Sequence, residues 1–177
     1  MDRELEIKVL NIDIEEMQEK LKQKGAEFIG VEIQTNHTFS PKNSNEFSNG
    51  YLRIREKTLN DKKEATELTF KESVDNKDNI RVNNEYTTTI DSISNMIKIL
   101  EEIGLVERYV GDKKRISYIY KGQRFDIDIW SKDVYPYPYM EIEFTNVNLI
   151  EEILDEFEID RKNVTSESIN ELIEKCK

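Results

Sequence analysis

Charged residues recur at every second position in several short segments of this 177-residue sequence. The first segment is ELEIK, in which Glu4, Glu6 and Lys8 alternate with apolar residues. A β-strand directs alternate side chains to opposite faces, so these three would share one face. Carboxylates beside a lysine can bind a divalent cation or another charged ligand. The same face could equally be the solvated side of an antiparallel sheet.

Six later segments repeat the alternation with other charges. The residues that share a face within a segment are Arg53 and Arg55, Glu67 and Lys71, Arg81 and Glu85, Lys113 and Arg115, Asp126 and Asp128, and Glu141 and Glu143. Most of these faces are predominantly acidic or basic, whereas a solvated face usually mixes charged and uncharged polar residues. Burying an unpaired ion costs several kcal/mol, so an inward-facing set needs pairing, hydration or a charged ligand. The inner face of a closed sheet is therefore the candidate site.

The elements that must position these side chains are mostly extended. Alternating or β-branched runs predict strands at 3–10, 31–40, 51–57, 64–73, 80–90, 105–111, 113–122, 123–130 and 135–144. Gly111 and Gly122 are expected to separate three of these runs, with a loop at 40–50 and a turn at 73–79.

Helical spacing predicts four helices between the extended runs, at 13–25, 92–104, 148–159 and 166–176. Ser92 is expected to cap the second helix, and Ser166, with Ser168 as the alternative, the fourth. Eight antiparallel strands can close into a barrel. The predicted fold class is therefore α+β, an eight-stranded closed antiparallel β-barrel, or tunnel, with helices packed outside. The chain length favours one domain over residues 1–177.

Composition excludes several function classes. The net charge of −11 argues against a nucleic-acid partner. Cys176 is the only cysteine, which excludes a disulfide framework and a cysteine zinc site. The sequence has no apolar run of transmembrane length and no signal-peptide core, so we expect a cytoplasmic protein without a membrane partner. Neither a P-loop nor a Ser-His-Asp or Cys-His arrangement is visible.

Several of these segments together resemble one known family. ELEIK resembles the Glu-x-Glu-x-Lys signature of the CYTH superfamily, also called triphosphate tunnel metalloenzymes, which groups class IV adenylyl cyclases, thiamine triphosphatases and inorganic triphosphatases. YLRIR resembles the family's paired-Arg strand, and LTFK, KKRISY, FDIDIW and PYMEIE resemble its later strands in order. VTSESINELI resembles the C-terminal segment of small bacterial cyclase-like members. The resemblance runs nearly end to end and implies a tunnel that binds the triphosphate end of its substrate.

The resemblance also implies residue roles. Mg²⁺ or Mn²⁺ would be held by Glu4, Glu6, Asp128, Glu141 and Glu143. Phosphate oxygens would be bound by Lys8, Arg53, Arg55, Lys71, Arg81, Lys113 and Arg115. Asp126 shares the face of Asp128 and is a weaker candidate. Without a metal, the crowded glutamates are expected to repel one another.

One position departs from the family pattern. A second acidic residue often follows at the alternate position after Glu85, and here Thr87 occupies it. Whether one or two metals bind therefore stays open. Glu85 is the candidate for activating the attacking water, and Lys71 is assigned to catalysis with it. His37, the only histidine, could be structural or could contact substrate at the tunnel mouth.

Three functions remain open at this point. The first is hydrolysis of inorganic triphosphate or of a small organic triphosphate such as thiamine triphosphate. The second is an adenylyl cyclase that converts ATP to cyclic AMP and pyrophosphate, and the third is a non-catalytic polyphosphate or nucleotide binder. Magnesium and manganese prefer oxygen ligands, Arg binds phosphate through a bidentate fork, and phosphoryl transfer needs mainly positioning and charge neutralisation. We rank the hydrolase first. We expect its partner to be a small-molecule triphosphate and its oligomeric state to be a monomer or a homodimer.

Overall fold

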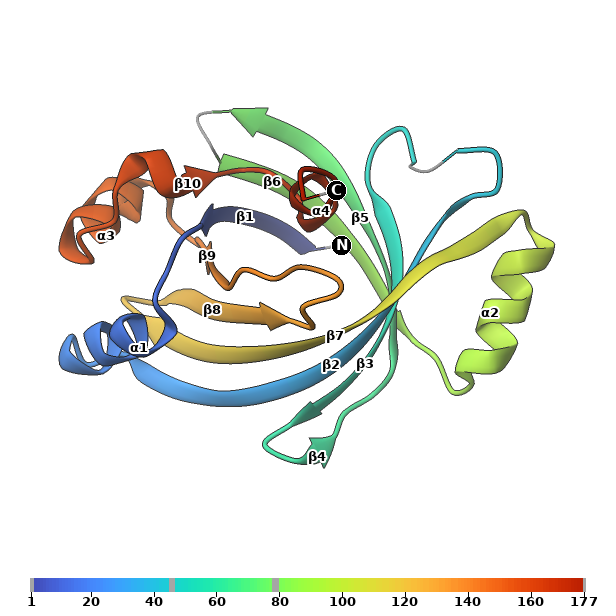
Figure 1. The fold of residues 1–177 in the computed structure, drawn as a ribbon, viewed down its shortest axis with the longest axis horizontal. Coiled ribbons are helices and arrows are strands. Elements are labelled where there is room, and N and C mark those ends of the chain that lie inside the picture. The colour runs from blue at the N-terminus through green and yellow to red at the C-terminus, as the bar shows by residue number, and fades with distance from the viewer. Residues whose placement is uncertain (1, 45–46, 78–79, 177) are drawn as a thin grey trace.

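Eight antiparallel strands pair with one another in a closed ring (Figure 1). The computed structural model describes residues 2–44, 47–77 and 80–176. The barrel strands are β1 (Asp2–Val9), β2 (Glu27–Pro41), β3 (Tyr51–Leu59), β5 (Glu67–Lys77), β6 (Ile80–Thr89), β7 (Leu105–Tyr120), β8 (Gln123–Trp130) and β9 (Tyr139–Glu143). Two short strands, β4 (Lys62–Lys63) and β10 (Val164–Thr165), were not predicted and pair outside the ring with β3 and β1.

The ring closes at β1. Its first half, Asp2–Glu6, pairs with β6, and its second half, Glu6–Val9, pairs with β9. The remaining strands complete the cycle in the order β6, β5, β3, β2, β7, β8 and β9. The predicted α+β fold with an eight-stranded closed barrel is therefore confirmed.

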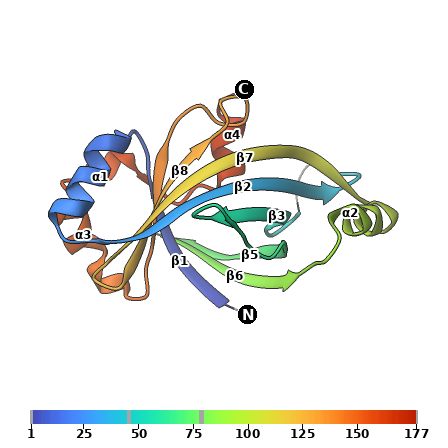
Figure 2. The same ribbon diagram turned by 90° about the horizontal axis from the view of Figure 1, so that it is seen from below.

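Three helices cover apolar outer faces of the strands, whereas the last one packs against Trp130 and Tyr139, which line the cavity. The helices are α1 (Ile14–Gln23), α2 (Ile93–Glu102), α3 (Ile150–Glu156) and α4 (Ile169–Glu174), with single 3₁₀ turns at 147–149 and 161–163. α1 and α3 lie at one end of the barrel and α2 at the opposite end in both views (Figures 1 and 2). Leu21 of α1 and Ile153 of α3 pack with Phe125 in the main core, whereas α2 places Leu100 against Phe39 and Ile54. Within the described ranges, no helix has the length and hydropathy needed to span a membrane.

Two predicted breaks between strands differ from the structure. β7 runs through Gly111 without interruption, whereas Gly122 lies in the left-handed region after the strand, as predicted for a turn. A Cβ on Gly111 would lie 3.0 Å from the Val134 side chain and 3.1 Å from the Trp130 ring, so this glycine permits close packing inside a strand. The expected turn at 73–79 was also wrong in extent because β5 continues to Lys77; residues 78–79 lie outside the described part of the chain.

The helix caps follow local chemistry. Ser92 caps α2 as predicted, since its hydroxyl accepts from the Asn95 backbone N–H. Ser168, the alternative, caps α4, and the preferred Ser166 was wrong. Glu171 stands three residues after Ser168 and completes a capping box with it, whereas the residue three after Ser166 is Ile169.

Candidate active site

The barrel encloses a cavity of about 400 Å³. Its lining includes every side chain predicted for the site except Asp128, namely Glu4, Glu6, Lys8, Arg53, Arg55, Lys71, Arg81, Glu85, Lys113, Arg115, Glu141 and Glu143. The alternation in each strand therefore predicted correctly which charged residues face inward. Asp128 is fully buried and does not line the cavity.

Arg53 and Arg55 of β3 carry positive charge that the protein does not fully neutralise. Arg55 is 8% exposed, and Asn36 Oδ1 accepts a hydrogen bond of 3.0 Å from its Nε. No carboxylate in the described ranges forms an ion pair with it. Burial, followed by repulsion from Arg53 and Arg115, lowers the pKa of Arg55, although a guanidinium stays charged at neutral pH. Arg53 Nε is a buried donor without a hydrogen-bond partner among the described residues.

Lys113 of β7 adds to this positive region. Its Nζ lies 2.7 Å from Asp128 Oδ2, but Arg115 also donates to both oxygens of the same carboxylate. One carboxylate thus serves two cations. Burial and then repulsion from Arg115 lower the pKa of Lys113 to about 7. We name Arg53, Arg55 and Lys113 the cation cluster.

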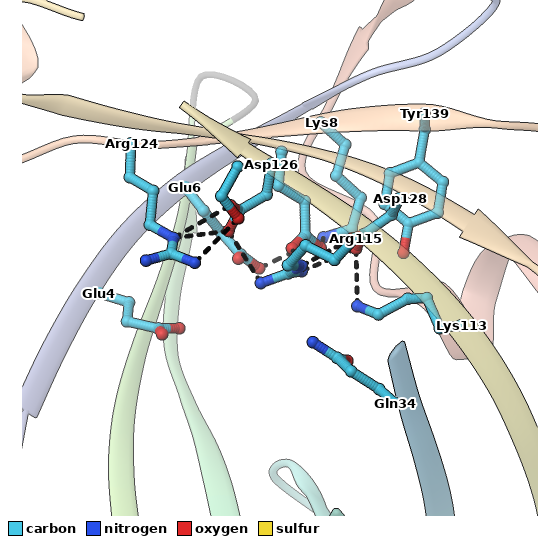
Figure 3. A network of polar contacts seen from close by, with 12 residues as sticks. Glu4, Glu6, Lys8, Gln34, Lys113, Arg115, Arg124, Asp126, Asp128 and Tyr139 are labelled. Atoms are coloured by element: carbon cyan, nitrogen blue, oxygen red, sulfur yellow. Dashed lines mark hydrogen bonds and ion pairs between the residues drawn. The ribbon is translucent and has the colours of Figure 1, made fainter. Parts of the chain in front are cut away.

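Arg115, in contrast, is surrounded by carboxylates (Figure 3). Its guanidinium contacts Asp128 at 2.6 Å, Asp126 at 2.8 Å and Glu141 at 2.5 Å. Burial opposes its charge, but these three acids raise the pKa of Arg115 well above its ordinary value. Its charge is therefore already balanced by the protein.

The acidic side of the cavity is only partly balanced. Lys8 Nζ lies 3.3 Å from Glu6 Oε1 and 3.2 Å from Glu141 Oε1. Burial alone would raise the pKa values of Glu6 and Glu141, but the Lys8 ammonium and further cations hold both below the ordinary value. The expected repulsion among the glutamates is therefore offset at these two positions. Glu143 has no ion pair in the described part of the chain, and burial followed by repulsion from Glu4 raises its pKa.

Lys71 contacts Glu85, the other predicted catalytic residue, and Glu4 on the acidic side. Its Nζ lies 2.6 Å from Glu85 Oε1 and 2.5 Å from Glu4 Oε2. Thr87, the departure from the family pattern, also lines the cavity, where its hydroxyl and that of Thr69 are 2.9 Å apart.

Arg81 connects the cavity with the C-terminal segment. Its Nη1 lies 3.4 Å from the Ser166 carbonyl and 3.5 Å from Glu171 Oε2 of α4, and its Nε lies 3.9 Å from Glu6. Arg81 therefore holds α4 against the barrel as well as facing Glu6.

The donors on the acidic side fit a hard divalent cation. No three Asp, Glu, His or Cys side chains of the described residues converge into a preformed metal site. Magnesium, however, is usually held by one or two carboxylates together with substrate phosphates. Glu4 and Glu143 both line the cavity, and repulsion from Glu4 contributes to the raised pKa of Glu143. A divalent cation bound between these two carboxylates would offset that repulsion.

Several lining residues were not predicted, although most obey the same alternation. Arg124 is in phase with Asp126, and its Nε donates to that carboxylate at 2.9 Å. In β2, the even-numbered Glu32 and Asn36 line the cavity. The odd-numbered His37 does not line it, and its Nδ1 lies 2.7 Å from Glu107 Oε1. His37 thus makes a polar contact with Glu107 outside the cavity.

Comparisons with known proteins agree with this architecture. PH1012 from Pyrococcus horikoshii OT3 superposes with a TM-score of 0.79 at 20% identity, covering 96% of this chain and 98% of its own. HpAC1 from Hippeastrum is a candidate adenylyl cyclase described as having a dominant triphosphatase activity. It superposes with a TM-score of 0.72 at 18% identity, covering 98% of this chain and 96% of its own. A candidate adenylate cyclase from Vibrio parahaemolyticus gives 0.74 at 12% identity and covers 97% of each chain. At these identities the likeness shows the fold alone.

A search of curated protein sequences found no match. The sequence model of the CYTH domain, in contrast, matches residues 2–171, which is nearly the whole chain. On this match, and with the closed tunnel it accompanies, the chain belongs to the CYTH domain family.

Proposed function

We propose that this protein is a metal-dependent hydrolase of inorganic triphosphate or a small organic triphosphate, bound inside the tunnel. The observation that carries the proposal is the cation cluster, Arg53, Arg55 and Lys113, which faces the cavity. The carboxylates near these cations do not balance their positive charge, so burial and mutual repulsion lower the pKa values of Arg55 and Lys113. A triphosphate supplies several negative charges and many acceptor oxygens. Its binding would neutralise the cluster and provide an acceptor for the unpartnered Arg53 Nε.

The cations divide into two roles in this proposal. Arg53 and Arg55 hold phosphate oxygens through their guanidinium forks, and Lys71 and Lys113 act as point charges. Lys71 and Lys113 are assigned this role although each also pairs with a carboxylate. Lys8, Arg81 and Arg115 contact Glu6 and Glu141, so they mainly hold the acidic side in place and touch phosphate secondarily.

The acidic side is proposed to hold Mg²⁺ or Mn²⁺. Glu4 and Glu143 are the first candidates, with Glu6 and Glu141 beside them. The bound ion would supply charge neutralisation to the phosphoryl oxygens during transfer. Glu85 is proposed to accept a proton from the attacking water, with Lys71, 2.6 Å away, holding the carboxylate in place.

The cyclase reaction is the second candidate. Tyr51 and Tyr109 line the same cavity and offer aromatic surface to a nucleobase, and the Vibrio protein is described as a candidate adenylate cyclase. The description of HpAC1, in which triphosphatase activity dominates, favours hydrolysis as the first choice.

The test is to incubate the full chain with inorganic triphosphate, thiamine triphosphate or ATP, each with Mg²⁺ or Mn²⁺. Orthophosphate, pyrophosphate and cyclic AMP are then measured separately. We expect orthophosphate from triphosphate and its loss on adding a chelator. Cyclic AMP with pyrophosphate as the main products from ATP would replace the hydrolase with the cyclase, and tight binding without turnover would leave a binding protein.

A further inference from the structure

We propose that Asp128 is a positioning residue that fixes Lys113 and Arg115, and that it does not bind the metal. The inference rests on the proposed function, since it concerns how the tunnel holds triphosphate. Asp128 is 0% exposed and, unlike Glu4, Glu6, Glu141 and Glu143, contributes no surface to the cavity. Its role must therefore be exerted through the residues that it touches.

Both oxygens of Asp128 are already used. Oδ1 accepts from Arg115 Nε at 2.6 Å, and Oδ2 accepts from Arg115 Nη2 at 2.7 Å and from Lys113 Nζ at 2.7 Å. This is a bidentate guanidinium–carboxylate pair with an added ammonium contact. A metal ion at Asp128 would have to displace both cations, whereas the Glu143 carboxylate has no ion pair in the described ranges.

The contact with Asp128 also fixes the direction of the Lys113 side chain (Figure 3). The Lys113 ammonium lies 5.2 Å from the centre of the Trp130 ring, within the range of a cation–π contact. Asp128 and Trp130 together hold Lys113 in the cavity wall, where its charge adds to that of Arg55. Without the carboxylate, repulsion from Arg55 and Arg115 would drive the ammonium away or favour its neutral form.

Asp128→Asn gives a test in which two effects have opposite signs. Removing a negative charge near the phosphates would, by itself, strengthen triphosphate binding. Losing the position and charge of Lys113 should weaken it, and we expect affinity in metal-free buffer to fall by about tenfold or more. Isothermal titration calorimetry with inorganic triphosphate and a chelator measures this. We expect the manganese-induced rise in melting temperature, measured without triphosphate, to match that of the wild type.

Glu143→Gln is the matched control, because Glu143 is a tunnel carboxylate that lines the cavity without an ion pair in the described ranges. It should show the reverse pattern, a lost manganese shift with metal-free triphosphate binding retained. Unchanged triphosphate affinity in Asp128→Asn, or a reduced manganese shift in it, overturns the inference. If the wild-type protein does not bind triphosphate at all, the proposed function fails instead.

Lys113→Met keeps the inference testable if Asp128→Asn does not fold. It removes the proposed mediator and leaves Asp128 paired with Arg115. We expect weaker metal-free triphosphate binding and an unchanged manganese shift. If Asp128 were a metal ligand, removing the competing ammonium should enlarge the manganese-induced rise in melting temperature. Either that result or an unchanged triphosphate affinity would refute the positioning role.

Discussion

Asn36 and Arg55 face each other across the β2–β3 pair, and the amide oxygen of Asn36 accepts the Arg55 Nε hydrogen bond. Asn36 is 2% exposed, and its Nδ2 is buried without a partner in the described part of the chain. A neutral amide orients the guanidinium without cancelling its charge. The pair therefore presents an unneutralised cation and an unused donor, as a phosphate site requires.

Asn36→Asp should separate stability from binding. The new carboxylate would neutralise Arg55, so we expect the melting temperature of the ligand-free protein to rise while triphosphate affinity falls by at least about tenfold. Thermal melts and calorimetry measure the two quantities. Asn36→Ala, which removes only the hydrogen bond, should weaken triphosphate binding by a smaller amount. If Asn36→Asp bound triphosphate as tightly as the wild type, the phosphates would have to lie elsewhere.

Replacing either Arg53 or Arg55 by Ala should cost roughly 2–5 kcal/mol of transition-state stabilisation, the cost of removing one partner of a desolvated charge pair. Arg55→Lys should restore only part of the loss because Lys lacks the planar fork. The readout is kcat/KM for triphosphate. Lys98→Ala on the exposed face of α2 is the control for removing a positive charge and should leave kcat/KM unchanged. Activity of both Ala variants within about threefold of wild type would contradict the assignment.

Much of the site could be predicted from sequence because the two-residue period of a strand is fixed by backbone geometry. Glu4, Glu6 and Lys8 had to share a face once ELEIK formed a strand, and the apolar residues between them had to face the helices. The same reasoning would have found Arg124, two positions before Asp126. Asn36 was missed because its neighbours on that face carry fewer charges, so the alternation in β2 is weaker.

The pairing of charges could not be predicted from the alternation, because it depends on the register between paired strands. Arg115 lies opposite Asp128 only through the β7–β8 register, and Glu143 lies opposite Glu6 only through closure of β1 onto β9. Which acid is neutralised and which is free therefore became visible only in three dimensions. Our proposal for Asp128 and the predictions for the glutamates rest on that difference.

Glu6 and Glu143 should respond in opposite ways to substitution by Gln. Cations lower the folded-state pKa of Glu6, so its charge stabilises the fold above the ordinary pKa of 4.5, and this contribution is lost as pH falls below it. The folded-state pKa of Glu143 is raised, so stability is lost as pH rises from 4.5 through that higher value. At neutral pH, Glu6→Gln should lower the free energy of unfolding by about 1–3 kcal/mol. Glu143→Gln should raise it, by less than about 1 kcal/mol after solvent screening.

Metal-free thermal melts of both variants and the wild type, at neutral pH and near pH 5, measure this contrast. The gain in Glu143→Gln should shrink near the lower pH, where the Glu143 carboxylate is partly protonated in the folded wild type. Equal shifts of the same sign in the two variants would show that the acidic side is uniformly balanced, contrary to the ion pairs described above.

Lys113 should take up a proton when triphosphate binds above neutral pH. Its pKa in the free protein is about 7, below its ordinary value of 10.5, so the ammonium is largely neutral near pH 8. The phosphates favour the charged form and raise this pKa, so binding near pH 8 should take up approximately one proton, and binding near pH 6 much less. Metal-free triphosphate affinity should accordingly fall as pH rises above 7. Calorimetry in two buffers of different ionisation enthalpy counts the protons, with Lys113→Met as the control that should take up none from this site. Identical proton counts in the wild type and Lys113→Met near pH 8 would exclude Lys113 from the phosphate site.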